Sequence, residues 1–76
     1  MLHEHDRVVL TANLSTLGLE AGDVGTVVYM YGDGRAYEVE FVSLSGEISI
    51  VATVEASQVR HVQKHEITHA RQLSRA

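Results

Sequence analysis

The segment His65-Glu66-Ile67-Thr68-His69 has the H-E-x-x-H form of a zinc-binding motif. If the segment is helical, His65 and His69 share a face and both ligate the metal, while Glu66 activates a water molecule. A catalytic zinc also needs a third ligand and an open position, and this motif lies near the end of a short chain. Three interpretations follow: a small zinc-binding hydrolase, a simpler metal site at His65 and His69, or a solvated helical face with incidental histidines.

Three more histidines lie outside this motif. His3 and His5 are two residues apart, so they point the same way if the N-terminal segment is extended. Together with His61 they would complete a metal site with the tail, within one chain or between two chains. The alternative, a loose polar terminus, is the one that we favour.

Other catalytic arrangements are missing from the sequence. There is no cysteine, which excludes a disulfide or a thiolate metal site. The turn 32–34 lacks the lysine and the helix of a phosphate-binding loop. Glu38 and Glu40 alternate with apolar residues, which indicates a solvated acidic face rather than a catalytic carboxylate pair. We therefore expect a protein with no enzymatic activity and no cofactor. The exception would be zinc bound at His65 and His69.

A β-hairpin over residues 24–41 positions most of the remaining candidates. Residues 24–31 are rich in β-branched and aromatic side chains, and the glycines of 32–34 suit a tight turn. Residues 37–41 alternate with period two, which places Tyr37, Val39 and Phe41 in the core. The chain has four aromatic residues, Tyr29, Tyr31, Tyr37 and Phe41. They form either a peptide-binding groove or part of the core.

The first strand of this hairpin has two apolar faces. Val27 and Tyr29 lie on one face, Val28 and Met30 on the other, and Gly25 is a candidate bulge. An exposed apolar patch on a small protein usually contacts a partner. We expect the outer face of Val28 and Met30, joined by Val51, to form such a patch. It would dock on the apolar stripe of the tail in a second copy, giving a homo-oligomer. The predicted interface residues are Val28, Met30, Val51, Ile67, Ala70 and Leu73.

The whole chain has the pattern of an all-β domain. Predicted strands cover residues 7–10, 24–31, 37–41, 48–54 and 59–62, with one helical turn at 55–58. The loop 11–18 carries Leu14 and Leu17, which we expect under the sheet. This order predicts a small five-stranded SH3-like barrel over residues 1–62, ahead of an OB-type barrel. Residues 63–76 carry a thin apolar stripe and are predicted to form a C-terminal helical tail.

Charge divides the chain of 76 residues into two parts. Residues 1–58 carry two basic and nine acidic side chains, whereas residues 59–76 carry four basic and one acidic. The acidic body disfavours nucleic acid, because affinity for phosphates depends on Lys and Arg. The basic tail is expected to lie on an acidic body, its own or a neighbour's. Without an apolar run long enough to span a membrane and without a visible signal peptide, we expect a cytoplasmic protein.

Four segments carry a resemblance to a known family: residues 6–11, 18–28, 31–34 and 36–41, which include Gly18-Leu-Glu-Ala-Gly-Asp-Val-Gly-Thr-Val-Val28 and Ala36-Tyr-Glu-Val-Glu-Phe41. They resemble a family of small bacterial domains of unknown function. The likeness covers about residues 6–62 and implies an SH3-like barrel but no activity. Family members usually have a proline where this chain has Leu14-Ser-Thr16, and their domain tends to end near Val62. Residues 21–27 are also similar to the KOW segment of ribosomal and transcription factors, but lack its basic residues.

These observations favour a non-enzymatic protein-binding module that associates with itself or with another protein. The first alternative is a KOW-like module associated with RNA or the ribosome. The second is a small zinc-binding hydrolase that uses His65, Glu66 and His69.

Overall fold

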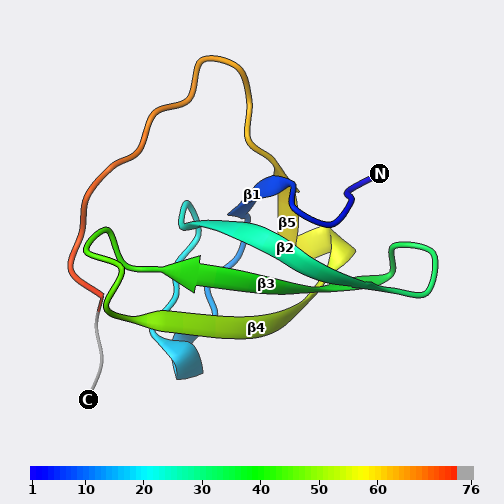
Figure 1. Cartoon of the computed structure of the whole chain (residues 1–76), viewed down its shortest axis with the longest axis horizontal. Helices are drawn as coiled ribbons and strands as arrows, with labels where there is room; N and C mark the ends of the chain where they lie inside the picture. The colour runs from blue at the N-terminus through cyan, green and yellow to red at the C-terminus, as the bar shows by residue number, and fades with distance from the viewer. Residues whose placement is uncertain (74–76) are drawn as a thin grey trace.

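The computed structural model describes residues 1–73, and residues 74–76 lie outside the described part. Five strands form one open antiparallel sheet with the order β4-β3-β2-β1-β5 (Figure 1). The strands are β1 (Arg7–Leu10), β2 (Val24–Tyr31), β3 (Ala36–Val42), β4 (Ser49–Glu55) and β5 (Val59–His61). Short 3-10 turns, η1 (Ser15–Leu17) and η2 (Ala56–Gln58), lie before β2 and before β5. The prediction of an all-β chain is confirmed.

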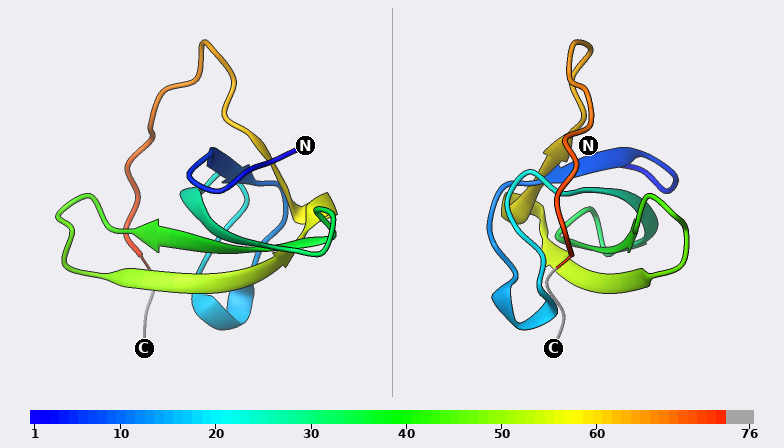
Figure 2. Two further views of the ribbon diagram at one scale, coloured as in Figure 1. Left: turned by 45° about the vertical axis from the view of Figure 1, so that its right-hand side comes forward. Right: turned by 90° about the vertical axis from the view of Figure 1, so that its left-hand side faces the viewer.

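The strand positions agree closely with the sequence patterns. Strands β1 and β2 begin and end at the predicted residues, β3 and β4 differ by one residue at each end, and β5 ends one residue earlier than predicted. The helical turn before β5 is also present, closed by a capping box between Glu55 and Gln58. The sheet curves around its own interior, as the two views of Figure 2 show.

The core fills the concave side of this sheet. Tyr37, Val39 and Phe41 are buried as the alternation predicts, at 2%, 0% and 5% exposure. Leu14 packs against the core cluster, whereas Leu17 is exposed, so only one of the two predicted loop leucines lies under the sheet. Leu2 is buried in the same cluster. The expectation of a loose N-terminal segment is therefore wrong.

Strand β2 contains a bulge that the sequence did not locate. Val27 pairs with Val39 and Tyr29 pairs with Glu38, which leaves Val28 without a partner on β3. Gly25 is instead a position of close approach, because a Cβ there would lie 2.6 Å from Val39 Cγ1 and 2.8 Å from the Glu40 carbonyl oxygen. The bulge therefore reverses the alternation beyond Val27.

The shared outer face predicted for Val28 and Met30 is therefore wrong. Val28 remains exposed, but Met30 pairs with Tyr37 and packs against the core cluster. Tyr29, expected to face inward with Val27, is exposed instead.

The tail is not helical over its described part. Residues 62–73 contain one turn, at 64–65, and otherwise no regular structure. They rise away from the body as an arch and return to it (Figures 1 and 2). The predicted C-terminal helix is wrong for residues 63–73, and its last three positions lie outside the described residues. The apolar stripe of Ile67, Ala70 and Leu73 is too thin to hold a helix against the sheet.

Across residues 1–73, no helix has the length and apolar character needed to cross a membrane.

Candidate functional site

The outer face of the sheet carries a group of exposed apolar side chains. Val28, Tyr29 and Tyr31 of β2 are 39%, 51% and 41% exposed, and Val51 of β4 is 55% exposed. The strand pairing places outward side chains in rows across β2, β3 and β4. One row consists of Thr26, Glu40 and Val51, and the next of Tyr29, Glu38 and Thr53. Tyr29, Tyr31, Val28 and Val51 are called the outer-face residues below.

The two tyrosines of this face are held in place by their neighbours. Their rings meet edge to face with centroids 4.9 Å apart. The Tyr31 hydroxyl donates to Glu38, and the Thr53 hydroxyl donates to both Glu38 carboxylate oxygens at 2.8 and 3.0 Å. The hydrogen bond to Glu38 raises the pKa of Tyr31. The face therefore presents ordered aromatic surface beside carboxylates that already accept hydrogen bonds.

Within residues 1–73, strand β4 has one edge with no strand beside it. It is paired with β3 over seven residues in a regular register. Bonds from Ser43 N–H to the Ile48 carbonyl and from Ala56 N–H to the Arg35 carbonyl fix the phase of the ladder. Because hydrogen-bonded pairs alternate in an antiparallel ladder, the groups that face the free edge belong to Ser49, Val51, Thr53 and Glu55.

The tail returns to the body through Arg71. Its Nε donates to Asp23 Oδ1 at 2.9 Å, and its Nη2 donates to Asp23 Oδ2 and to the Gly18 carbonyl at 3.1 Å. Glu20 lies 3.6 Å from Arg71 Nη1. Two residues later, Leu73 packs against the core cluster. The basic tail therefore meets the acidic body of its own chain at Arg71, while residues 61–70 stay exposed.

A contact within the body also holds the Asp23 carboxylate in position. Glu20 N–H donates to Asp23 Oδ2 at 2.8 Å, and Gly18 turns the chain with φ of 73°. Burial opposes the ionisation of Asp23, but the Arg71 and Glu20 hydrogen bonds outweigh it, so the pKa of Asp23 lies below its usual value. The side chains of Arg71 and Asp23 are only 25% and 18% exposed.

The H-E-x-x-H segment does not have the geometry that a zinc motif needs. Residues 65–69 are exposed and not helical, and Ile67 is 92% exposed at the arch. Glu66 accepts hydrogen bonds from Arg60 Nη1 and Nη2 at 2.9 and 2.7 Å and from Gln63 N–H at 2.6 Å. Chiefly through Arg60, these bonds lower the pKa of Glu66 to about 2, which makes it a weak base.

No cluster of three or more His, Cys, Asp or Glu within residues 1–73 is placed to hold a metal. The helical basis for the metal prediction is therefore missing, and binding at His65 and His69 stays a prediction without structural support.

Two of the other histidines do meet, around Asp6. His61 Nε2 lies 3.2 Å from Asp6 Oδ2, and His3 Nδ1 lies 3.8 Å from the same oxygen. The pKa of Asp6 is lowered, first by a hydrogen bond from His3 N–H. His5 is used differently, because its backbone N–H bonds the Val27 carbonyl at 2.7 Å. The N-terminal segment is thus tied to β2 and β5.

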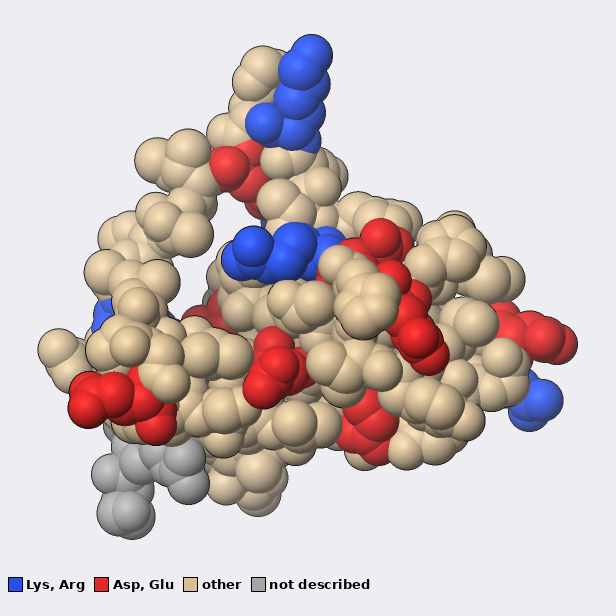
Figure 3. All heavy atoms as spheres, in the orientation of Figure 1, with Lys and Arg blue, Asp and Glu red and all other residues tan. Residues whose placement is uncertain are grey.

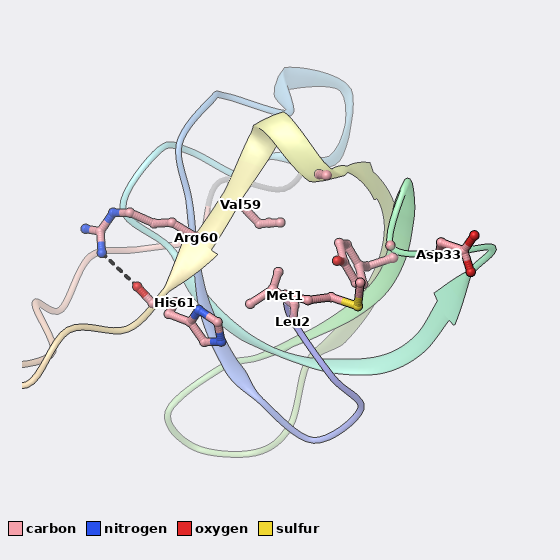
Figure 4. A pocket seen from close by; sticks show the side chains of 9 residues that line it. Met1, Leu2, Asp33, Val59, Arg60 and His61 are labelled. Atoms are coloured by element: carbon pink, nitrogen blue, oxygen red, sulfur yellow. Dashed lines mark hydrogen bonds between the residues drawn. The ribbon is translucent and has the colours of Figure 1, made fainter.

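A shallow hollow of about 450 Å³ opens beside this cluster. Met1, Leu2, Val59, Arg60 and His61 line it together with the turn between β2 and β3, Tyr37 of β3 and Ala56 of η2 (Figure 4). Arg60 bonds the His61 carbonyl at 3.0 Å and extends away from the hollow. The sequence did not indicate this feature, because residues 1–6 look polar apart from Met1 and Leu2.

The six predicted interface residues end in different places. Val28 and Val51 lie on the outer face, Ile67 and Ala70 lie in the exposed arch, and Met30 and Leu73 pack on the core of their own chain. The sequence missed the outward turn of Tyr29 and the Arg71–Asp23 anchor. The contrast in charge between body and tail was the only sequence feature that pointed to that anchor.

Comparison with known proteins gives one result. No curated protein and no solved structure matches this chain. The family model Domain of unknown function (DUF4926) matches residues 4–61, which include every strand of the sheet. The chain therefore belongs to the DUF4926 family of domains of unknown function.

Proposed function

We propose that the chain is a non-enzymatic protein-binding module that associates with itself through β4 and the outer face. The observation that carries this proposal is the continuity between an unpaired strand edge and exposed apolar side chains. Val51 belongs to both, because its backbone groups face the free edge and its side chain lies on the outer face. Unpaired strand edges are templates for pairing with another chain.

We propose that the domain is an SH3-like barrel. Five short strands in the order β4-β3-β2-β1-β5, a 3-10 turn before β5, and a single core on the concave side support it. In such a barrel the two ends of the sheet do not pair with each other, which leaves β4 available.

The composition of β4 suits pairing with a second copy of itself. In a two-fold antiparallel arrangement centred on Ala52, Val51 faces Thr53 of the other copy and Ser49 faces Glu55. All four residues that face the edge then find a partner, and Glu55, the only charged residue of β4, meets no like charge. The Glu38 and Glu40 side chains of the two copies lie three strand spacings apart, about 14 Å, beyond the screening length at physiological salt.

Light scattering after size-exclusion chromatography tests this proposal. We expect a dimer at micromolar concentration for the native sequence and a monomer for Val51→Lys, because an edge lysine disfavours strand pairing. Leu44→Lys is the matched control: it introduces the same charge at a side chain that is 82% exposed in the β3–β4 turn. It should remain dimeric. A monomeric native protein, or a dimer unaffected by Val51→Lys, would contradict the proposal.

A further inference from the structure

Arg71 and Leu73 occupy a two-point site on the body. Every residue from 61 to 70 is exposed, and Arg71 and Leu73 are the next side chains to be partly buried. In an extended chain, side chains at positions i and i+2 point the same way. This spacing lets Arg71 reach Asp23 while Leu73 packs on the core cluster. The arch before them stands clear of the body in the space-filling view (Figure 3).

The polar part of the site and its occupant lie in different parts of the chain. Gly18, Glu20 and Asp23 all lie within the family match of residues 4–61, whereas Arg71 and Leu73 lie beyond it. Asp23 is also held by Glu20 N–H at 2.8 Å, a contact that does not involve the tail. The polar receptor is therefore built by the domain itself, and the tail behaves as a ligand attached to it.

The chemistry of the site selects arginine at the first position. Two Asp23 oxygens and the Gly18 carbonyl accept from Nε and Nη2 of one guanidinium group. A planar guanidinium makes such parallel bonds, and a lysine ammonium group does not. Glu20, 3.6 Å from Nη1, adds negative potential. Two residues further along, the site accepts an aliphatic side chain.

We propose that this site binds an extended Arg-x-Leu segment of a partner protein, and that in this chain the tail occupies it. The inference rests on the protein-binding function proposed above, names the chemical class of the partner, and places it on a surface other than β4. The occupant is a basic and aliphatic peptide, which complements the acidic body. The tethered tail competes with a partner at an effective concentration of the order of millimolar.

Fluorescence anisotropy with a labelled peptide of residues 66–73 tests the proposal on the full-length chain. The variant Arg71→Ala/Leu73→Ala empties the site, and we expect it to bind the peptide saturably. The native chain should bind it at least about tenfold more weakly, because its own tail competes. A peptide with lysine in place of arginine should also bind about tenfold more weakly, from the loss of charged hydrogen bonds.

A second substitution in the emptied chain shows whether binding is specific. Adding Asp23→Asn should abolish saturation. Adding Asp33→Asn, which makes the same chemical change in the exposed turn between β2 and β3, should leave binding unchanged. Circular dichroism checks that each variant is folded, and Arg71→Ala alone replaces the double variant if that one unfolds.

Two results would overturn the inference: no saturable binding by a folded emptied chain, or equal binding with and without Asp23→Asn. Neither depends on the oligomeric state. Repeating the titration in the Val51→Lys background separates the two proposals. If the dimer is lost and the peptide still binds, the Asp23 site works independently of self-association through β4.

Discussion

Two arginine–carboxylate pairs hold the two ends of the arch, and they differ in sequence separation, in exposure and in what they fix. Arg60 and Glu66 are six residues apart, with side chains 38% and 33% exposed. Arg71 and Asp23 are 48 residues apart, with side chains 25% and 18% exposed. The first pair fixes a local turn that includes Gln63 N–H. The second ties the chain end to the body.

The difference shows that a short ion-pair distance does not by itself predict importance. An exposed pair exchanges good hydration for a bond of similar free energy, so its net contribution to stability is small. A partly buried pair has lost that hydration, so removing one partner leaves the other poorly solvated. We therefore expect the arch to be much more sensitive to changes at its Arg71 end than at its Arg60 end.

The largest expected effect comes from Asp23→Asn. The change removes the charge that Arg71 needs, but keeps the side-chain volume. We expect the free energy of unfolding to fall by about 1–2 kcal/mol. Urea denaturation measures the loss, and hydrogen exchange should show weakened protection at residues 18–23.

Asp33→Asn is the control for this measurement, because Asp33 is exposed in a turn. It should change stability by much less. Equal effects of the two substitutions would show that net charge, and not the Arg71 anchor, is responsible.

Acid should remove the contribution of the same pair. The pKa of Asp23 is lowered in the folded state from an ordinary value of 3.8. The unfolded chain therefore takes up the proton first, so the stabilisation is complete above about pH 4 and is lost as the pH falls through the folded-state pKa. The difference in melting temperature between the native chain and Asp23→Asn should shrink below pH 3.8. A constant difference down to low pH would contradict this assignment.

The sequence predicted the strands far better than these anchors, for a physical reason. Alternation within residues 37–41 is local, and burial of every second side chain follows from strand geometry alone. The run Val27-Val-Tyr-Met30 has no polar residue to mark its phase, so the bulge at Val28 left no trace in the pattern. The Arg71–Asp23 contact spans 48 residues, and only the contrast in charge between tail and body suggested it.

The prediction of a helical tail was wrong for a related reason. Residues 65–73 have a helical spacing of apolar side chains, but the stripe buries too little surface to repay the ordering of a helix. Two polar contacts to the body, at Glu66 and Arg71, hold the segment as an arch instead. Helical spacing in a short terminal segment is therefore weak support for an H-E-x-x-H site.

A smaller effect is expected for Arg71→Lys, which keeps the charge but loses the parallel hydrogen bonds. Stability should fall by about 1 kcal/mol or less, roughly the net value of one typical hydrogen bond. Limited trypsin digestion at Lys64 measures the release of the arch, and Arg71→Lys should be cleaved faster than the native chain. Cleavage at the native rate would show that Leu73 alone holds the tail.

The smallest effect is expected for Glu66→Gln at the other end of the arch. Glu66 and Arg60 are solvated, and the amide oxygen of glutamine still accepts a hydrogen bond from Gln63 N–H. The melting temperature should hardly change, and trypsin should cleave at Lys64 only slightly faster. High salt should reduce even this difference, since screening weakens exposed pairs more than buried ones. If Glu66→Gln destabilised the chain as much as Asp23→Asn, exposure would not separate the two pairs, and the arch would depend on its turn as much as on its anchor.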